Sequence, residues 1–154
     1  MAATGHNPRV RALLALVIAL AAGCSRTPVD PVEALLAELE AAAEARDAER
    51  FGERIAPEFH GAHDLGRAEA LAQLKRYLAA YESVAIEVYG VESERDGAAA
   101  RVRCVVEFSG QARKAFGLEG LLPPSAVYRF DLDVADEGGT WRVRGATWEP
   151  VEAP

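Results

Sequence analysis

The chain has 154 residues, half of them hydrophobic, which suits one domain with a single core. Its 24 acidic residues outnumber its 17 Lys and Arg, so the formal net charge is −7. This acidity disfavours nucleic acids and anionic lipid head groups as partners, because both repel a negative surface.

The first 23 residues have the layout of a secretory signal. Arg9 and Arg11 precede an unbroken apolar run over residues 12–22, which is too short to cross a bilayer as a helix. The following Leu20-Ala21-Ala22-Gly23-Cys24 resembles the lipobox of bacterial lipoproteins, in which the cysteine is acylated and becomes the first mature residue. That pattern prefers leucine where this chain has Ala21. The alternative is ordinary cleavage after Ala21, which would leave Cys24 as a plain thiol.

The lipobox resemblance implies a location. Cys24 is the predicted site of lipid attachment, with palmitate as a typical acyl group, and the domain would face the periplasm at the cell envelope. Removing residues 1–23 removes two arginines and no acid, so membrane contact should come from the acyl chains alone. Ser25 is not the aspartate that marks inner-membrane retention, which implies the outer membrane if the host has one. Residues 24–29 would be a tether, 30–149 the domain and 150–154 a tail.

Three helices are expected after the tether. Asp30 before Pro31 is a typical helix start, and an apolar stripe follows at helical spacing, formed by Val32, Leu35, Leu36, Leu39 and Ala43. Asp47 begins a short helix that includes Phe51 and Ile55 and ends before Pro57. The third helix is predicted over residues 67–81, with Leu71, Leu74, Leu78 and Tyr81 on one stripe and Tyr77 at its border.

From Val84 the apolar period changes to two, which predicts strands. Strands over 86–94 and 99–109 flank Asp96-Gly97, and strands over 126–135 and 140–147 flank residues 136–139. Two hairpins are therefore expected. The connection over residues 110–124 contains four large apolar residues, and it is interpreted either as a lid or as a loop whose leucines pack on the rim of the core.

Alternation within the last hairpin predicts which side chains face solvent. We expect Asp133 opposite Arg142 on the outer face, with the valines and leucines of the same strands on the core side. Trp141 and Trp148 are seven residues apart, so both reach the core only if the strand bulges, most simply at Gly145.

Helices followed by strands predict an α+β domain, here a curved antiparallel sheet wrapped around N-terminal helices. The element order, the Asp96-Gly97 turn and the late Thr140-Trp141-Arg142-Val143-Arg144-Gly145 segment resemble the nuclear transport factor 2-like, or cystatin-like, cone superfamily over residues 30–149. That superfamily includes isomerases, dehydratases and hydrolases, and also domains without known activity, so the resemblance does not by itself imply catalysis.

The predicted inner face of the cone is apolar. Its proton-bearing exceptions on the strands are Tyr128 and Cys104, and parity places the strand carboxylates outside. We expect Cys104 to be a core residue. An apolar ligand would meet the side chains predicted to line the interior, which are Tyr77, Tyr81, Cys104, Tyr128 and Trp141.

His60-Gly61-Ala62-His63-Asp64 is the other polar cluster in the sequence. His60, His63 and Asp64 could supply three zinc ligands, with Glu69 as a fourth, and the alternative is a pH-sensitive polar loop. No metal and no cofactor are expected. The sequence favours a non-catalytic binding or accessory domain for an apolar small ligand or an envelope protein, as a monomer or weak dimer. The alternative is a cone-fold enzyme that uses this cluster or Tyr128.

Overall fold

The computed structural model describes residues 29–113 and 124–151. Its helices are α2 (Pro31–Glu44), α3 (Ala48–Glu53), the short 3-10 helix η2 (Ala62–Asp64) and α4 (Arg67–Ala79). Its strands are β1 (Ile55–Gly61), β2 (Tyr81–Asp96), β3 (Ala99–Ala112), β4 (Ser125–Asp136) and β5 (Trp141–Pro150).

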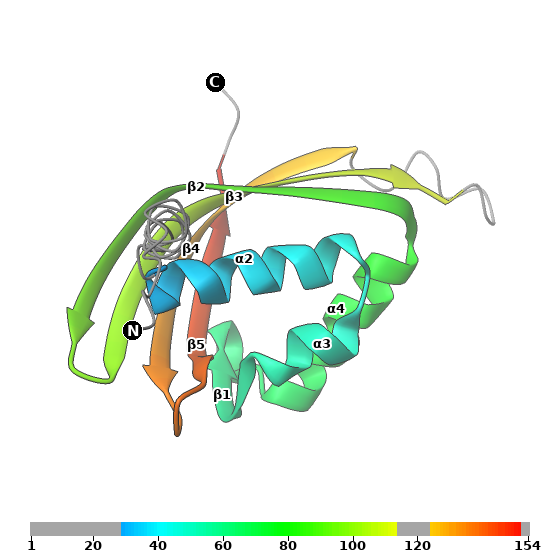
Figure 1. Cartoon of the computed structure of the whole chain (residues 1–154). Helices are drawn as coiled ribbons and strands as arrows, with labels where there is room; N and C mark the ends of the chain where they lie inside the picture. Colours follow the sequence, from blue (N-terminus) through cyan, green and yellow to red (C-terminus); the bar gives the residue numbers. More distant parts are fainter. Residues whose placement is uncertain (1–28, 114–123, 152–154) are drawn as a thin grey trace, which may run out of the picture.

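The strands form one curved, unclosed sheet in the order β1-β5-β4-β3-β2. β1 runs parallel to β5, and the other neighbours are antiparallel. The helices lie on the concave side, where α2 runs along the sheet (Figure 1). The α+β class and the wrapping of the sheet around N-terminal helices are confirmed, but the sheet is mixed and not purely antiparallel.

Local sequence explains the start of α2. The Asp30 side chain accepts a hydrogen bond of 2.8 Å from the backbone N–H of Val32, and Pro31 occupies the first turn, where no amide donor is needed. The predicted apolar stripe, together with Ala42, is buried. This face of α2 therefore covers the concave side of the sheet.

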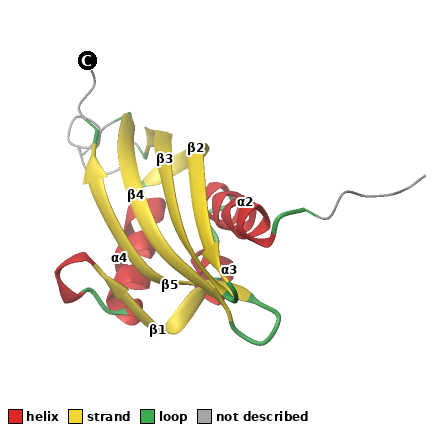
Figure 2. Cartoon of the chain, turned by 90° about the vertical axis from the view of Figure 1, so that its left-hand side faces the viewer, coloured by secondary structure: helices red, strands yellow, loops and turns green. Residues whose placement is uncertain are grey.

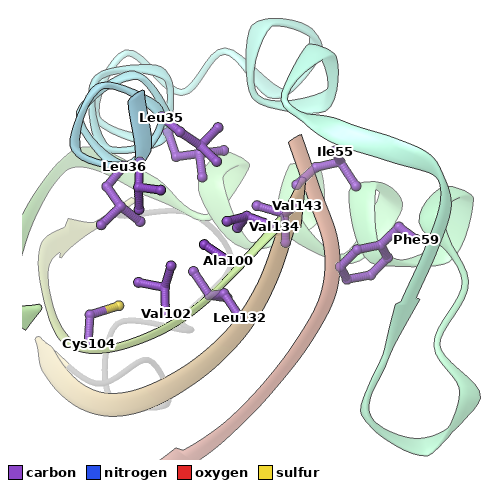
Figure 3. Close-up of a cluster of buried hydrophobic side chains, with 12 residues drawn as sticks. Leu35, Leu36, Ile55, Phe59, Ala100, Val102, Cys104, Leu132, Val134 and Val143 are labelled. Carbon is purple, nitrogen blue, oxygen red and sulfur yellow. The ribbon is translucent and has the colours of Figure 1, made fainter. Parts of the chain in front are cut away.

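The main core lies between α2 and the middle of the sheet. Leu35 and Leu36 of α2 point toward Val102, Cys104 and Leu132 of the strands, as Figure 3 shows. Val102 has no exposed surface, and Val32 and Val134 are almost as deeply buried. Burial of this apolar surface is the main force that holds helix and sheet together.

β1 corrects the prediction for Ile55. This residue does not extend the short helix, because α3 ends at Glu53 and Ile55 begins a strand opposite Val143 of β5. The third helix likewise ends at Ala79, and Tyr81 begins β2. Both errors have one physical reason: strand pairing with a distant segment outweighs weak local helical preference.

The last hairpin corrects the predicted register. Asp133 lies opposite Gly145, not Arg142. The predicted loop over residues 136–139 is displaced, because Asp136 pairs with Trp141, and Arg144 is an extra residue on β5. Asp133 remains exposed as predicted. The bulge lies at Arg144–Gly145, so the expected irregularity near Gly145 is confirmed, and it turns Trp148 toward the side of Phe130.

Cys24 lies outside the described residues. So do Phe116, Leu118, Leu121 and Leu122, the four apolar residues of the connection that was interpreted as a lid or a packed loop. Within residues 29–113 and 124–151, no helix is long and apolar enough to cross a membrane.

Candidate functional site

A second core cluster lies where α4 meets the start of β2. It contains Leu78, Tyr81, Val84 and Phe108, with the half-buried Tyr77 packed against them. The rings of Tyr77, Tyr81 and Phe108 contact one another, with centroid distances of 4.9–5.2 Å. Tilted and edge-on arrangements at this spacing stabilise aromatic clusters, so this end of the interior is packed.

A set of three aromatic side chains, which we call the aromatic rim, continues this surface toward solvent. It consists of Tyr128, Phe130 and Trp148 from β4 and β5. Phe130 stacks on Trp148 with a centroid distance of 5.9 Å and an angle of 29°, and Tyr128 meets Phe130 edge-on at 6.4 Å. Trp148 is 39% exposed, whereas Phe130 is half-buried and packs against the main core. The rim is therefore an apolar surface that connects the core to solvent.

The structure separates the five side chains predicted to bind a ligand. Tyr77 and Tyr81 are in contact, but Cys104 is only 2% exposed within the main core. Trp141 pairs with Asp136 beside the hairpin turn, whereas Tyr128 pairs with Pro150 at the other end of β4. The Arg95 guanidinium lies over the Trp141 ring, with its Cζ 5.2 Å from the ring centroid, and it also forms an ion pair with Asp30. Phe130 and Trp148 were not among the predicted binding residues, because their stack depends on the bulge in β5.

Two interior groups have shifted pKa values. Burial raises the pKa of the Tyr77 phenol, and a hydrogen bond with Tyr81 adds to this effect. Burial also raises the pKa of the Cys104 thiol to about 11, with a smaller contribution from Asp131. Both groups therefore stay protonated near neutral pH, which removes them as a general base and as a thiolate nucleophile.

The histidine cluster is spread over two surfaces. His60 is exposed on β1, and its neighbour Phe59 is buried, so the imidazole lies on the outer side of the sheet. His63 and Asp64 are exposed in η2 with φ values of 58° and 60°. Within the described part of the chain, no three His, Cys, Asp or Glu side chains are arranged to hold a metal ion. The structure therefore does not bring His60, His63 and Asp64 together as a set of three zinc ligands.

The strand carboxylates lie outside, as parity predicts. Asp131 and Asp133 face Arg103 and Arg101 at 3.1 and 3.6 Å, and all four side chains are about half exposed or more. No charged side chain in the described residues is buried. The outer face of the sheet thus carries exposed ion pairs, whereas the concave face carries the apolar core residues of β3 and β4.

Comparison of the whole domain with solved structures identifies its architecture. A candidate dehydratase of the nuclear transport factor 2-like family from Streptomyces avermitilis aligns with a TM-score of 0.68 at 18% identity, over 80% of this chain and 96% of that one. A candidate scytalone dehydratase from Novosphingobium aromaticivorans aligns at 0.67 and 12% identity, over 79% and 83%. A protein with a cystatin-like fold from Caulobacter vibrioides aligns at 0.62 and 18%, over 80% and 89%.

The chain has the nuclear transport factor 2-like fold. At identities of this size the likeness concerns the fold alone, and the chemistry of a nuclear transport factor 2-like domain depends on the side chains that it carries. No protein-family model matches the sequence, and no curated protein matches it significantly.

Proposed function

We propose that this domain is a non-catalytic binding module for an apolar small molecule, held at the cell envelope by a lipid on Cys24. The observation that carries the binding proposal is the aromatic rim. A tryptophan that is 39% exposed and stacked on a half-buried phenylalanine offers a flat apolar surface to solvent. Such surfaces stabilise bound ligands by removing apolar area from water.

The side chains around the rim favour binding over proton transfer. The Tyr77 and Cys104 pKa values move upward, away from neutrality. General acid–base catalysis needs a group that exchanges its proton near the working pH, often with a second group that stabilises developing charge. The carboxylates that could supply such a group, Asp131 and Asp133, lie on the opposite face of the sheet.

A small molecule suits this surface better than an envelope protein does. The rim is formed by three side chains, whereas a stable protein interface usually buries about 800 Å² on each partner. The larger outer face is covered by charged residues, which are depleted from the centres of protein interfaces. The shape and apolar contacts of the rim would therefore select the ligand.

Binding can be measured with N-phenyl-1-naphthylamine, an uncharged apolar fluorophore. Saturable fluorescence enhancement is expected with the wild-type chain, and Trp148→Ala should weaken it at least about ten-fold, which is a loss of about 1.4 kcal/mol. Tyr89→Ala is the matched control, because Tyr89 is a similarly exposed aromatic residue on β2, outside the rim. Equal weakening by the two substitutions, or no saturable signal with the wild type, would refute the proposal.

The lipid anchor rests on the sequence of residues 9–25, where two arginines, an apolar run and Gly23-Cys24 follow one another. The full-length chain, expressed in a bacterium that processes lipoproteins, should incorporate labelled palmitate and appear in the membrane fraction. Cys24→Ser should abolish both results. A mature protein that begins at Ala22 with an unmodified Cys24 would instead establish ordinary signal cleavage.

A further inference from the structure

Trp148 is the outermost ring of the aromatic rim. β4 and β5 run side by side, as Figure 2 shows, and Phe130 of β4 lies directly opposite Trp148 of β5. Tyr128 lies opposite Pro150 in the same way. Directly opposed residues of paired strands point to the same face of a sheet. The rim and Pro150 therefore form one continuous apolar surface, at the end of β4 and β5 that is remote from their hairpin turn.

The rings of the rim differ in how they meet. Phe130 and Trp148 form an offset stack, with centroids 5.9 Å apart and planes 29° from parallel. Tyr128 meets Phe130 edge-on, at 6.4 Å and 65°. Phe130 thus has an aromatic neighbour on either side, whereas 39% of the Trp148 surface is exposed. The stack ends at Trp148, where the indole is open to solvent.

The aromatic cluster of Tyr77, Tyr81 and Phe108 offers no such surface. Its rings meet at angles of 50–73°. Tyr81 has no exposed surface, and Phe108 is 5% exposed. A ligand could reach these two rings only by displacing the core around them. Of the two aromatic groups, the rim is therefore the one that a ligand can contact without rearranging the fold.

Pro150 extends the surface of Trp148 along β5. It is exposed and lies two residues further on, which is about 7 Å along a strand. Indole and pyrrolidine rings are rigid, so little conformational freedom is lost when a ligand settles on them. A strip of this length suits two fused six-membered rings better than a single ring.

The strip favours a flat ligand over a puckered or flexible one. A planar ring laid on the indole brings all of its atoms into contact at once, whereas a saturated ring brings only its projecting hydrogens into contact. Stacked aromatic rings also attract each other through their quadrupoles, beyond the burial of apolar area. The ligand should be uncharged, because no side chain of the rim carries a charge that could pair with it.

We propose that the ligand of the aromatic rim is a flat, uncharged molecule with fused aromatic rings, which extends the Phe130–Trp148 stack by one ring. This inference rests on the binding function proposed above and narrows it. An apolar surface that did not stack with its ligand would bind aliphatic molecules of the same size equally well.

The compounds 2-naphthalenemethanol and decahydro-2-naphthalenemethanol are a matched pair of probes, because they share a carbon skeleton and a hydroxyl group and differ only in saturation. Their affinities can be measured by NMR titration of the isotopically labelled chain. The ratio of the two affinities, aromatic over saturated, should be about three- to ten-fold higher for the wild type than for Trp148→Leu. Leucine keeps an apolar side chain but removes the flat ring, and comparing ratios cancels the difference in hydrophobicity between the probes. Trp148→Phe retains a flat ring and should keep most of the preference.

The ring protons of Trp148 provide a second measurement, which needs no variant. An aromatic ring stacked on the indole should shift these protons upfield through its ring current, and the saturated probe should not. Trp141 is the internal control, because it lies beside the hairpin turn and its signals should not move.

Equal affinity ratios for the wild type and Trp148→Leu would overturn the stacking proposal, and so would Trp148 ring protons that do not move upfield on addition of 2-naphthalenemethanol. Saturable binding of both probes would in that case leave the broader binding function standing. If neither probe nor N-phenyl-1-naphthylamine binds the wild type, the proposed function is refuted and this inference with it. Circular dichroism should show that both variants are folded; if Trp148→Leu is not, the ring-proton shifts of the wild type decide the question.

Discussion

Truncation of Leu35 tests whether the deep interior of the cone is packed. Leu35 is 2% exposed on α2 and belongs to the main core with Val102 and Leu132. Leu35→Ala removes about three methylene-sized groups, for a lost transfer free energy of about 2.4 kcal/mol. The cavity left behind adds to this value, so the free energy of unfolding should fall by about 3–5 kcal/mol. At about 4 °C per kcal/mol, the melting temperature should fall by about 12–20 °C.

Leu74→Ala is the matched control for this experiment. It is the same chemical change, on the half-buried side of α4, and neighbouring groups and solvent can fill the space. Its effect should be about half as large or less. Both variants can be measured by urea unfolding followed by circular dichroism. If Leu35→Ala destabilises the chain no more than Leu74→Ala does, α2 does not pack tightly on the sheet, and a ligand would then have to be sought in the deep interior.

Three further changes test other parts of the structure. Gly110→Ala should destabilise the chain by about 1–3 kcal/mol, because its Cβ would lie 2.7 Å from the buried Tyr81 ring and 2.9 Å from the Ser83 carbonyl oxygen; a neutral result in urea unfolding would contradict this packing. The Cys104 thiol should resist alkylation by iodoacetamide at pH 9 in the folded chain, since burial raises its pKa to about 11. It should react once the chain is unfolded, and mass spectrometry of the peptide that contains Cys104 would show the difference. Asp30→Ala should lower the unfolding free energy by about 0.5–2 kcal/mol through loss of the α2 cap, an effect that added salt should not abolish.

The chemical difference between the concave and outer faces of the sheet follows from the alternation of apolar and polar residues along the strands. Each strand of the central hairpins places apolar residues on the concave side and charged residues on the outer side. The same sequence pattern therefore supplies an apolar rim on one face and exposed ion pairs on the other.

Some features of this protein could be predicted from its sequence because they depend on local chemistry. The start of α2 follows from Asp30 and Pro31, which satisfy the first turn without any distant contact. The first hairpin follows from Asp96-Gly97, because Gly97 adopts the positive φ of 58° that the turn requires. Strict alternation in β3 and β4 predicted which side chains face the core, and these predictions are confirmed.

Only the tertiary structure decided the features that depend on pairing between distant strands. Ile55 belongs to β1 because it pairs with Val143 of β5, and the sequence around Ile55 does not indicate that distant pairing. The extra residue at Arg144 displaces the register, which brings Trp148 onto Phe130 and places Gly145 between His60 and Asp133. Alternation determines the face on which a side chain lies, but register determines its neighbours. The aromatic rim is a set of neighbours, which is why the sequence alone did not reveal it.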